Sequence, residues 1–318
     1  MASRKDVALR AGVSQATVTN VFNRCKFVSP EIRSRVLQAA AEIGYDDVSA
    51  QEFVLLVKDA DNPYNGMILS GMKEAAAKYG ATVSLVLVDN DADKVISDLA
   101  KRKVAGVFSA IAEETIDLKL RDTLSNSGIS VSFSWEDFYI EFQEAIDQLI
   151  AYLFSMGHSR IAYLSGIPMR KESNIRFASF CNAIERLGGT IHYELLIDGT
   201  FPYTTDVISG YQAAKKLLAT GAKFTAVYAV NDLMALGASR AFREAGLSIP
   251  EDISVVGCDN IRFGEFATPP LTTLDVSAVE MGRQIIYMLL QKNNGTDTQK
   301  IHIVPQLVVR KSTGVAKK

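Results

Sequence analysis

From residue 53 onward, short apolar runs alternate with amphipathic segments, and this alternation constrains the fold more than any other feature of the chain. Runs of five or six largely apolar residues indicate strands buried on both faces of a parallel sheet. The predicted strands are Phe53–Val57, Val83–Val88, Val104–Phe108, Ile129–Phe133, Arg160–Leu164, Ala226–Val230 and Ile253–Gly257. The predicted helices between them are Gly66–Tyr79, Glu144–Phe154, Ile175–Leu187, Asp206–Leu218 and Leu233–Ala245.

This alternation continues to about residue 258, which gives more strands than one small sheet holds. The chain of 318 residues also has the length of about two domains. We therefore expect an α/β protein with two similar lobes, each a doubly wound parallel sheet covered by helices on both faces.

The first 45 residues have no strand pattern and instead carry the pattern of a helix-turn-helix. Gly12 supplies a turn that needs a left-handed backbone, and Ser14 is a natural N-cap for the helix that follows. A third helix is expected to begin at Ser29-Pro30 and to reach Ile43. The small and apolar residues that face inward are Val7, Ala8, Ala11, Val13, Val18 and Val21.

The outer face of the second helix is polar and has the chemistry of base recognition. Gln15 and Asn20 can each pair with adenine, and the methyl group of Ala16 can contact thymine. Hydroxyl groups and nearby cations would hold phosphates. The residues expected to contact DNA are Ser14, Gln15, Ala16, Thr17, Asn20, Asn23, Arg24, Ser29 and Arg33. The alternative is that residues 4–23 form an αα-hairpin with a purely structural role.

Charge is divided unevenly along the chain. The whole chain carries a formal charge of −2, but residues 1–45 carry +4, so the remainder carries −6. A basic coat over the whole molecule is therefore excluded, whereas a basic DNA-binding segment on an acidic body is favoured.

The cysteines and the apolar runs predict a cytoplasmic protein. Cys25, Cys181 and Cys258 are far apart and outside any metal or redox motif, as reduced thiols would be. No signal peptide precedes the first helix, and no run approaches the ~20 apolar residues of a membrane span. Neither a cofactor nor a metal is expected.

The motifs and their order resemble the lactose/galactose repressor (LacI/GalR) family over nearly the whole chain. The resemblance implies a homodimeric transcription regulator, usually a repressor, that binds palindromic operator DNA. Its core is expected to fold like a periplasmic sugar-binding protein, with the effector held between the lobes. The matching stretches are DVALRAGVSQATVTNVFN (6–23), VSPEIRSRVLQAAAEIGY (28–45), Asn62-Pro63-Tyr64, GHSRIAYLSG (157–166), AVNDLMALGA (229–238), IPEDISVVGCDN (249–260), PPLTTL (269–274) and LVVRKSTG (307–314).

The resemblance also suggests domain boundaries. The helix-turn-helix headpiece takes residues 1–45, a linker takes 46–52, and the effector-binding core takes 53–318. Within the core, we expect the first lobe at about 53–157 and 275–300, and the second at about 158–274 and 301–318.

The linker departs from the family, which normally has a hinge helix here with a leucine that wedges into the minor groove. Residues 46–52 read DDVSAQE, contain no leucine, and are too few for a helix with connectors. Residues 46–51 span at most ~20 Å, whereas the two half-sites lie about one turn, ~34 Å, apart. We therefore expect headpiece docking without the central kink in the DNA.

Effector contacts carry over from the family only where its motifs align. Arg176 matches an arginine of the family motif, and Asn231 and Asp259 follow predicted strands, where ligands of open α/β sheets bind. Segment 132–142 lacks the family's Asp-Asn pair, so Glu144 or Glu141 is expected to replace the missing aspartate. The expected effector-binding set is Tyr64, Glu144, Arg176, Phe201, Asn231 and Asp259, with Tyr203 as an alternative aromatic wall. A sugar is the favoured effector; a nucleobase or a sugar phosphate stays open.

Two rival functions leave features unexplained. An enzyme is disfavoured because His158, His192 and His302 are scattered and no nucleotide or metal motif is present. An exported solute-binding protein would need a signal peptide and would leave residues 1–45 without a purpose.

Overall fold

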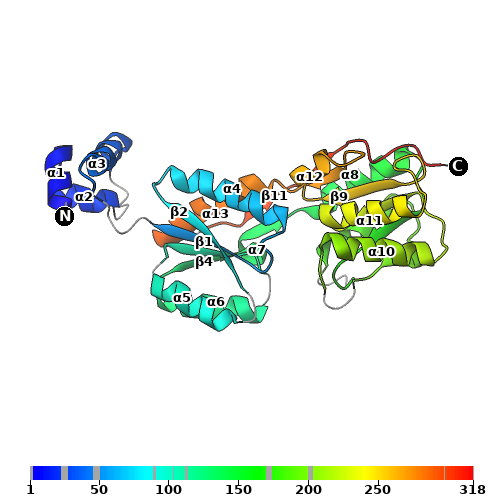
Figure 1. Cartoon of the computed structure of the whole chain (residues 1–318), viewed down its shortest axis with the longest axis horizontal. Helices are drawn as coiled ribbons and strands as arrows, with labels where there is room; N and C mark the ends of the chain where they lie inside the picture. Colours follow the sequence, from blue (N-terminus) through cyan, green and yellow to red (C-terminus); the bar gives the residue numbers. More distant parts are fainter. Residues whose placement is uncertain are drawn as a thin grey trace.

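The computed structural model describes residues 3–22, 28–45, 51–88, 91–102, 104–111, 114–169, 174–199, 203–296 and 298–317. These residues form a small helical headpiece and two α/β lobes, which follow one another along the long axis of the molecule (Figure 1). No helix in the described ranges is long and apolar enough to cross a membrane.

The headpiece consists of three helices, α1 (Arg4–Ala11), α2 (Gln15–Phe22) and α3 (Pro30–Glu42). Gly12 has the left-handed backbone that the turn requires, with φ 62°. The backbone N–H of Thr17 donates to Ser14 Oγ at 3.0 Å, and the N–H of Ile32 donates to Ser29 Oγ at 3.3 Å. Both serines therefore cap helices as predicted. The expected small and apolar side chains form one buried cluster between the helices.

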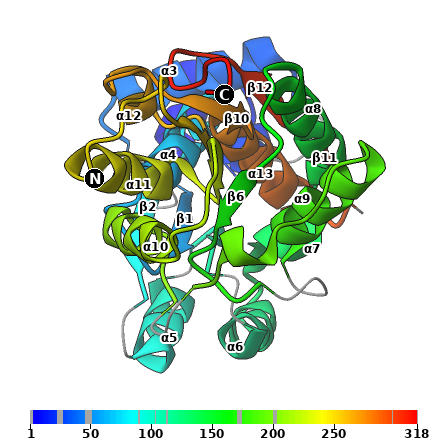
Figure 2. The ribbon, with the colours of Figure 1, turned by 90° about the vertical axis from the view of Figure 1, so that its right-hand side faces the viewer.

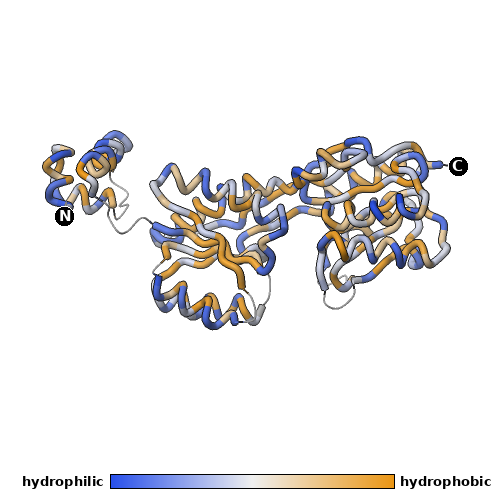
Figure 3. The backbone as a smooth tube through the Cα atoms, in the orientation of Figure 1, coloured by the Kyte–Doolittle hydropathy of each residue, from blue (hydrophilic) through white to orange (hydrophobic). Residues whose placement is uncertain are grey.

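The first lobe is built on a parallel sheet of four strands in the order β2-β1-β3-β4. The strands are β1 (Glu52–Val57), β2 (Thr82–Leu87), β3 (Gly106–Ser109) and β4 (Ser130–Phe133), and the helices are α4 (Pro63–Ala77), α5 (Ala92–Arg102), α6 (Glu114–Asn126) and α13 (Ala278–Asn293). Alternate residues of β1 enter different cores, one under α4 and α13 and the other under α5 and α6. Both faces are therefore covered, and the sheet strands are mostly apolar (Figure 3).

Two glycines let α4 and α13 cross closely. A Cβ atom on Gly71 would lie 1.8 Å from the carbonyl oxygen of Val279, and one on Gly282 would lie 2.1 Å from that of Ile68. Neither position has room for a side chain.

The second lobe has a sheet of six strands in the order β12-β10-β9-β8-β6-β7, of which only β12 runs antiparallel to its neighbour. Helices α8 and α9 cover one face and α10 and α11 the other (Figure 2). The strands are β6 (Ile161–Leu164), β7 (Leu196–Ile197), β8 (Ala226–Ala229), β9 (Ser254–Cys258), β10 (Thr272–Asp275) and β12 (Gln306–Val308). The helices are α8 (Phe142–Ser155), α9 (Ile175–Arg186), the 3-10 turn η1 (Tyr193–Leu195), α10 (Val207–Ala219), α11 (Asp232–Glu244) and α12 (Arg262–Glu265).

The boundary between the lobes is not where the sequence placed it. We expected the first lobe to run to about residue 157, but α8 packs into the core of the second lobe, so the chain crosses near Glu141. We also assigned residues 301–303 to the second lobe, but β11 (Ile301–Ile303) pairs with β5 (Phe138–Ile140) and packs against the first core. The linker prediction falls mainly on residues 46–50, which lie outside the described ranges.

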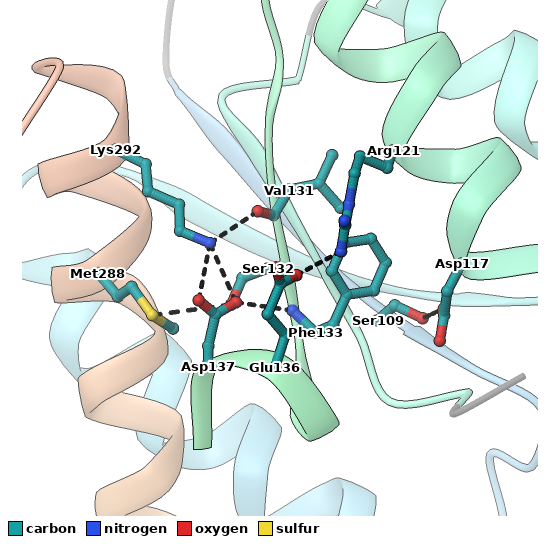
Figure 4. A network of polar contacts seen from close by, with 10 residues as sticks. All are labelled: Ser109, Asp117, Arg121, Val131, Ser132, Phe133, Glu136, Asp137, Met288 and Lys292. Carbon is teal, nitrogen blue, oxygen red and sulfur yellow. Dashed lines mark hydrogen bonds and ion pairs between the residues drawn. The ribbon is translucent and has the colours of Figure 1, made fainter. Parts of the chain in front are cut away.

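A partly buried ion pair fixes the short helix α7 (Ser134–Asp137) that follows β4 (Figure 4). Lys292 Nζ of α13 donates to both carboxylate oxygens of Asp137, at 2.9 and 3.0 Å, and to the carbonyl oxygen of Val131 at 3.0 Å. Asp137 also accepts from the hydroxyl of Ser132 and the backbone N–H of Phe133. Because every charge has a partner, this pair can be buried without an uncompensated cost.

Candidate DNA-binding and effector sites

The second headpiece helix presents an exposed polar face. Gln15, Ala16 and Asn20 are exposed, whereas Val18 and Val21 on the opposite side are buried against α1 and α3. The predicted base-reading side chains therefore share one face of α2 and are free to enter a groove.

The cap of α2 leaves a hydroxyl hydrogen for a phosphate. Ser14 and Thr17 hydroxyls lie 2.8 Å apart, so one donates to the other and one hydrogen stays available. Ser29 Oγ accepts a backbone N–H in its cap, and its hydroxyl also hydrogen-bonds to the Glu31 carboxylate. The Ser14–Thr17 pair can therefore hold the helix start and contact DNA at the same time.

The headpiece cations have different surroundings. Arg33 is half-buried and donates to the carbonyl oxygen of Val21 at 3.3 Å, which places its charge at the carboxyl end of α2. Arg10 makes a two-bond pair with Glu42 at 2.8 and 2.7 Å, so its charge is largely neutralised. Asn23 and Arg24 lie outside the described residues.

Arg176 is held in place in the first turn of α9, in the second lobe. Its Nη1 donates to the carbonyl oxygen of Val230 at 2.6 Å, and its guanidinium carbon lies 4.9 Å from the centre of the Phe142 ring. Although burial lowers the pKa of Arg176, the neighbouring Cys258 and Asp259 raise it overall. The side chain is a fixed, permanently charged donor.

Asp259 lies immediately after β9 and has a left-handed backbone, with φ 113°. Its side chain is buried, and burial raises its pKa to about 6, although the positive charge of Arg176 opposes this. Asp259 is therefore electrostatically coupled to Arg176, and a carboxyl group with such a pKa can accept a hydrogen bond near neutral pH.

Both polar atoms of the Asn231 side chain already make one hydrogen bond each. Its Oδ1 accepts from the N–H of Met234 at 2.9 Å as the N-cap of α11, and its Nδ2 donates to the carbonyl oxygen of Thr205 at 2.9 Å. The amide group therefore holds two segments together, and its second N–H and second lone pair are the capacity that an effector contact could use.

Tyr64 lies in the first turn of α4, after the N-cap Asn62. It is the side chain that the first lobe contributes to the candidate site. Its ring packs against the cores of both lobes, and its hydroxyl donates to Met281 Sδ at 3.5 Å. Burial raises the pKa of Tyr64, and the charge of Asp259 adds to the increase. Tyr64, Arg176 and Asp259 consequently form one electrostatic group between the lobes.

The remaining predicted effector residues are not in this group. Glu144 is exposed on α8, whereas Glu141 is half-buried at the crossing and accepts from the N–H of Gln143 and the hydroxyl of Tyr139. Of the two glutamates left open by the sequence, Glu141 has the position between the lobes. Phe201 lies outside the described residues, and Tyr203 is half exposed.

Two neighbours of the site were not predicted. Phe142 lies under the guanidinium group of Arg176. Asp232 is fully buried and accepts from Thr273 Oγ1 at 2.5 Å and from the N–H of Ile261 at 2.8 Å. The Asn-Asp pair at 231–232 was the only available signal for Asp232. In the described parts of the chain, no group of three or more His, Cys, Asp or Glu side chains could hold a metal ion.

An exposed helix-turn-helix joined to two lobes with polar groups between them defines the class of ligand-responsive DNA-binding regulators. Comparison with known proteins supports this class. Residues 4–46 match the family described as bacterial regulatory proteins, lacI family, and residues 150–313 match the periplasmic binding protein-like domain.

Full-length relatives are found among curated proteins. The HTH-type transcriptional repressor PurR of Histophilus somni (strain 129Pt) is 33% identical, covering 98% of this chain and 99% of the relative. PurR of Pasteurella multocida (strain Pm70) is 31% identical, covering 98% of each.

Solved structures with the same fold include a CelR–cellobiose complex, with 27% identity, a TM-score of 0.70, and coverage of 98% of this chain and 100% of that one. A lac repressor dimer bound to operator and the anti-inducer ONPF has 25% identity, a TM-score of 0.70, and coverage of 98% and 99%. The chain belongs to the lacI family and is a DNA-binding regulator of the repressor type with a small-molecule effector.

Proposed function

We propose that this chain acts as a homodimer on a palindromic operator and places α2 of each headpiece in a major groove. Gln15, Ala16 and Asn20 read bases, while Ser14, Thr17, Ser29 and Arg33 contact phosphates. Asn23 and Arg24 extend the set. The single observation that carries this proposal is the exposed polar face of α2 beside hydroxyls that keep a free hydrogen. The related lac repressor dimer bound to operator supports the assembly.

The effector binds between the lobes and is a sugar or sugar derivative. Tyr64 comes from the first lobe and Arg176 and Asp259 from the second, so a ligand that contacts all three favours one arrangement of the lobes. Asn231 contributes through its remaining hydrogen-bonding capacity, and Glu141 is preferred to Glu144 because of its place at the crossing. Coupling of ~1–3 kcal/mol to DNA affinity is the usual scale for such control. Catalysis is not part of this proposed function; the similar curated proteins are described as transcriptional repressors.

Salt dependence of DNA binding tests this proposal. The affinity of the full chain for duplex DNA, measured by fluorescence anisotropy, should fall steeply with salt because phosphate contacts release counterions. Replacing Arg33 by Gln should reduce the slope of log affinity against log salt by ~1. Arg186→Gln is the control, because that exposed arginine is in the second lobe and bonds to Asp147. Absence of DNA binding, or equal slopes for both variants, would contradict the proposal.

A further inference from the structure

Two tyrosine hydroxyls buried in the second lobe have no hydrogen-bond partner among the described residues. Tyr163 on β6 and Tyr228 on β8 are register partners, each has no exposed surface, and their ring centres lie 5.5 Å apart. A buried hydroxyl without a partner costs free energy, so such a pair calls for an explanation.

The tyrosine rings pack against the inner face of α9. The Tyr163 ring centre lies 5.6 Å from that of Phe177 and 5.1 Å from that of Phe180, both on the inner face of α9. The charge of Arg176 acts on both hydroxyls. Burial raises the pKa of Tyr163 and of Tyr228, so both groups keep their protons and act as donors.

The first turn of α9 adds donors of the same kind. This helix of twelve residues has no acidic side chain in its first turn, and the side-chain oxygen of its N-cap Asn174 accepts the N–H of Phe177 at 3.1 Å. The N–H groups of Ile175 and Arg176 are at the positive end of the helix and have no partner within it. A helix start, a guanidinium group and two hydroxyls therefore offer donors in one region.

Two further groups face this region. Asp259 lies beside Arg176 and contributes negative charge, and Tyr64 approaches from the first lobe. A ligand that fits must present lone pairs to the donors and a hydroxyl to Asp259.

We propose that Arg176, the first turn of α9 and the hydroxyls of Tyr163 and Tyr228 form an oxyanion-binding part of the effector site, which takes the carboxylate or phosphate group of a sugar derivative. This rests on the proposed function, because it assumes that the effector binds between the lobes. A neutral sugar hydroxyl can accept from both tyrosines, but it brings a proton of its own that needs an acceptor, and it carries no charge to pair with Arg176. An oxyanion accepts both and is also stabilised by the helix start.

Matched pairs of sugars test the ligand class. The full chain is mixed with D-glucose, D-glucuronate, D-glucose 6-phosphate, D-ribose or D-ribose 5-phosphate, and Tm is measured with each. An anionic sugar should raise Tm more than its neutral counterpart. Equal shifts within the pairs, or no shift with any anionic sugar, would overturn the oxyanion assignment.

Tyrosine-to-phenylalanine variants test the two hydroxyls. The Kd for the anionic sugar should weaken about tenfold or more in Tyr163→Phe and in Tyr228→Phe, as expected for a hydrogen bond to a charged group. Tyr193→Phe is the control, because Tyr193 is 78% exposed, and its Kd should equal that of the unmodified chain. An unchanged Kd in both buried variants would overturn the role of the hydroxyls.

Measurements without a ligand separate this inference from its alternatives. Tm should stay equal or rise in both buried variants, because an unpaired hydroxyl is removed; a fall would show that the free protein already pairs these groups and would overturn the proposal. DNA affinity should be unchanged in the control variant Tyr193→Phe. If the unmodified chain fails to bind DNA, the proposed function fails, and that result is independent of the sugar measurements.

Discussion

Asp259 shows how one residue links the site to stability. Burial raises its pKa from 3.8 to about 6, so the folded protein holds this proton more tightly than the unfolded chain. Its contribution to stability is therefore fully present below the unfolded pKa and is lost as the pH rises through about 6. At neutral pH the Asp259 carboxyl group is ionised although burial opposes its charge, so it lowers the free energy of unfolding. Groups with pKa values shifted in this way are common at ligand sites.

Replacing Asp259 by Asn should raise the free energy of unfolding at pH 8 by ~1–3 kcal/mol, because a shift of about two pKa units no longer opposes folding. At pH 5 the gain should be smaller. Denaturant unfolding at both pH values measures it. An equal effect at the two pH values would show that the carboxyl group is not perturbed as described.

Residue identities at the site were only partly predictable. Arg176, Asp259 and Tyr64 could be placed because each stands in a motif or follows a predicted strand. The choice between Glu141 and Glu144 stays open from the sequence, because periodicity does not reveal which carboxyl group lies at a crossing. The hydroxyls of Tyr163 and Tyr228 had no sequence signal, because both residues read as ordinary apolar strand positions.

At the scale of elements, close helix contacts depend on glycine. Gly71→Ala should destabilise the protein by ~1–3 kcal/mol, because the added methyl group collides with the backbone of α13. Gly66→Ala on the same helix is the matched control: a methyl group there would enter open space, so the change should stabilise by ~0.5–1 kcal/mol. Thermal unfolding measures both. Similar effects of the two changes would contradict the close crossing.

All seven predicted strands exist, with ends shifted by one or two residues, because buried parallel strands produce apolar runs. Strands β5, β7, β11 and β12 have three residues or fewer, too short for a periodic signal. Strand β10 reads as polar, yet Thr272 and Thr273 are fully buried, since their hydroxyls bond to Thr313 and Asp232. The points where the chain passes from one lobe to the other were not predicted either, because they depend on which hydrophobic core a helix packs into.

At the scale of the whole molecule, we expect the short linker to limit how the headpieces reach DNA. Residues 46–52 have no leucine to insert between base pairs. We therefore predict an operator bound without a strong bend at its centre. A circular-permutation gel assay measures the bend, with a relative that carries the hinge helix as the control. A strong central bend with this chain would show that another residue acts as the wedge.

The central claim is that α2 reads bases for an effector-controlled regulator. Selection of binding sites from random duplex DNA, followed by titration of single base-pair substitutions, tests it most directly. The unmodified chain should select a two-fold symmetric site. Asn20→Ala should change the preference at one symmetric position by ~1–3 kcal/mol and leave the other positions unchanged. Selection of no symmetric site, or uniform weakening on every sequence by Asn20→Ala, would contradict the account.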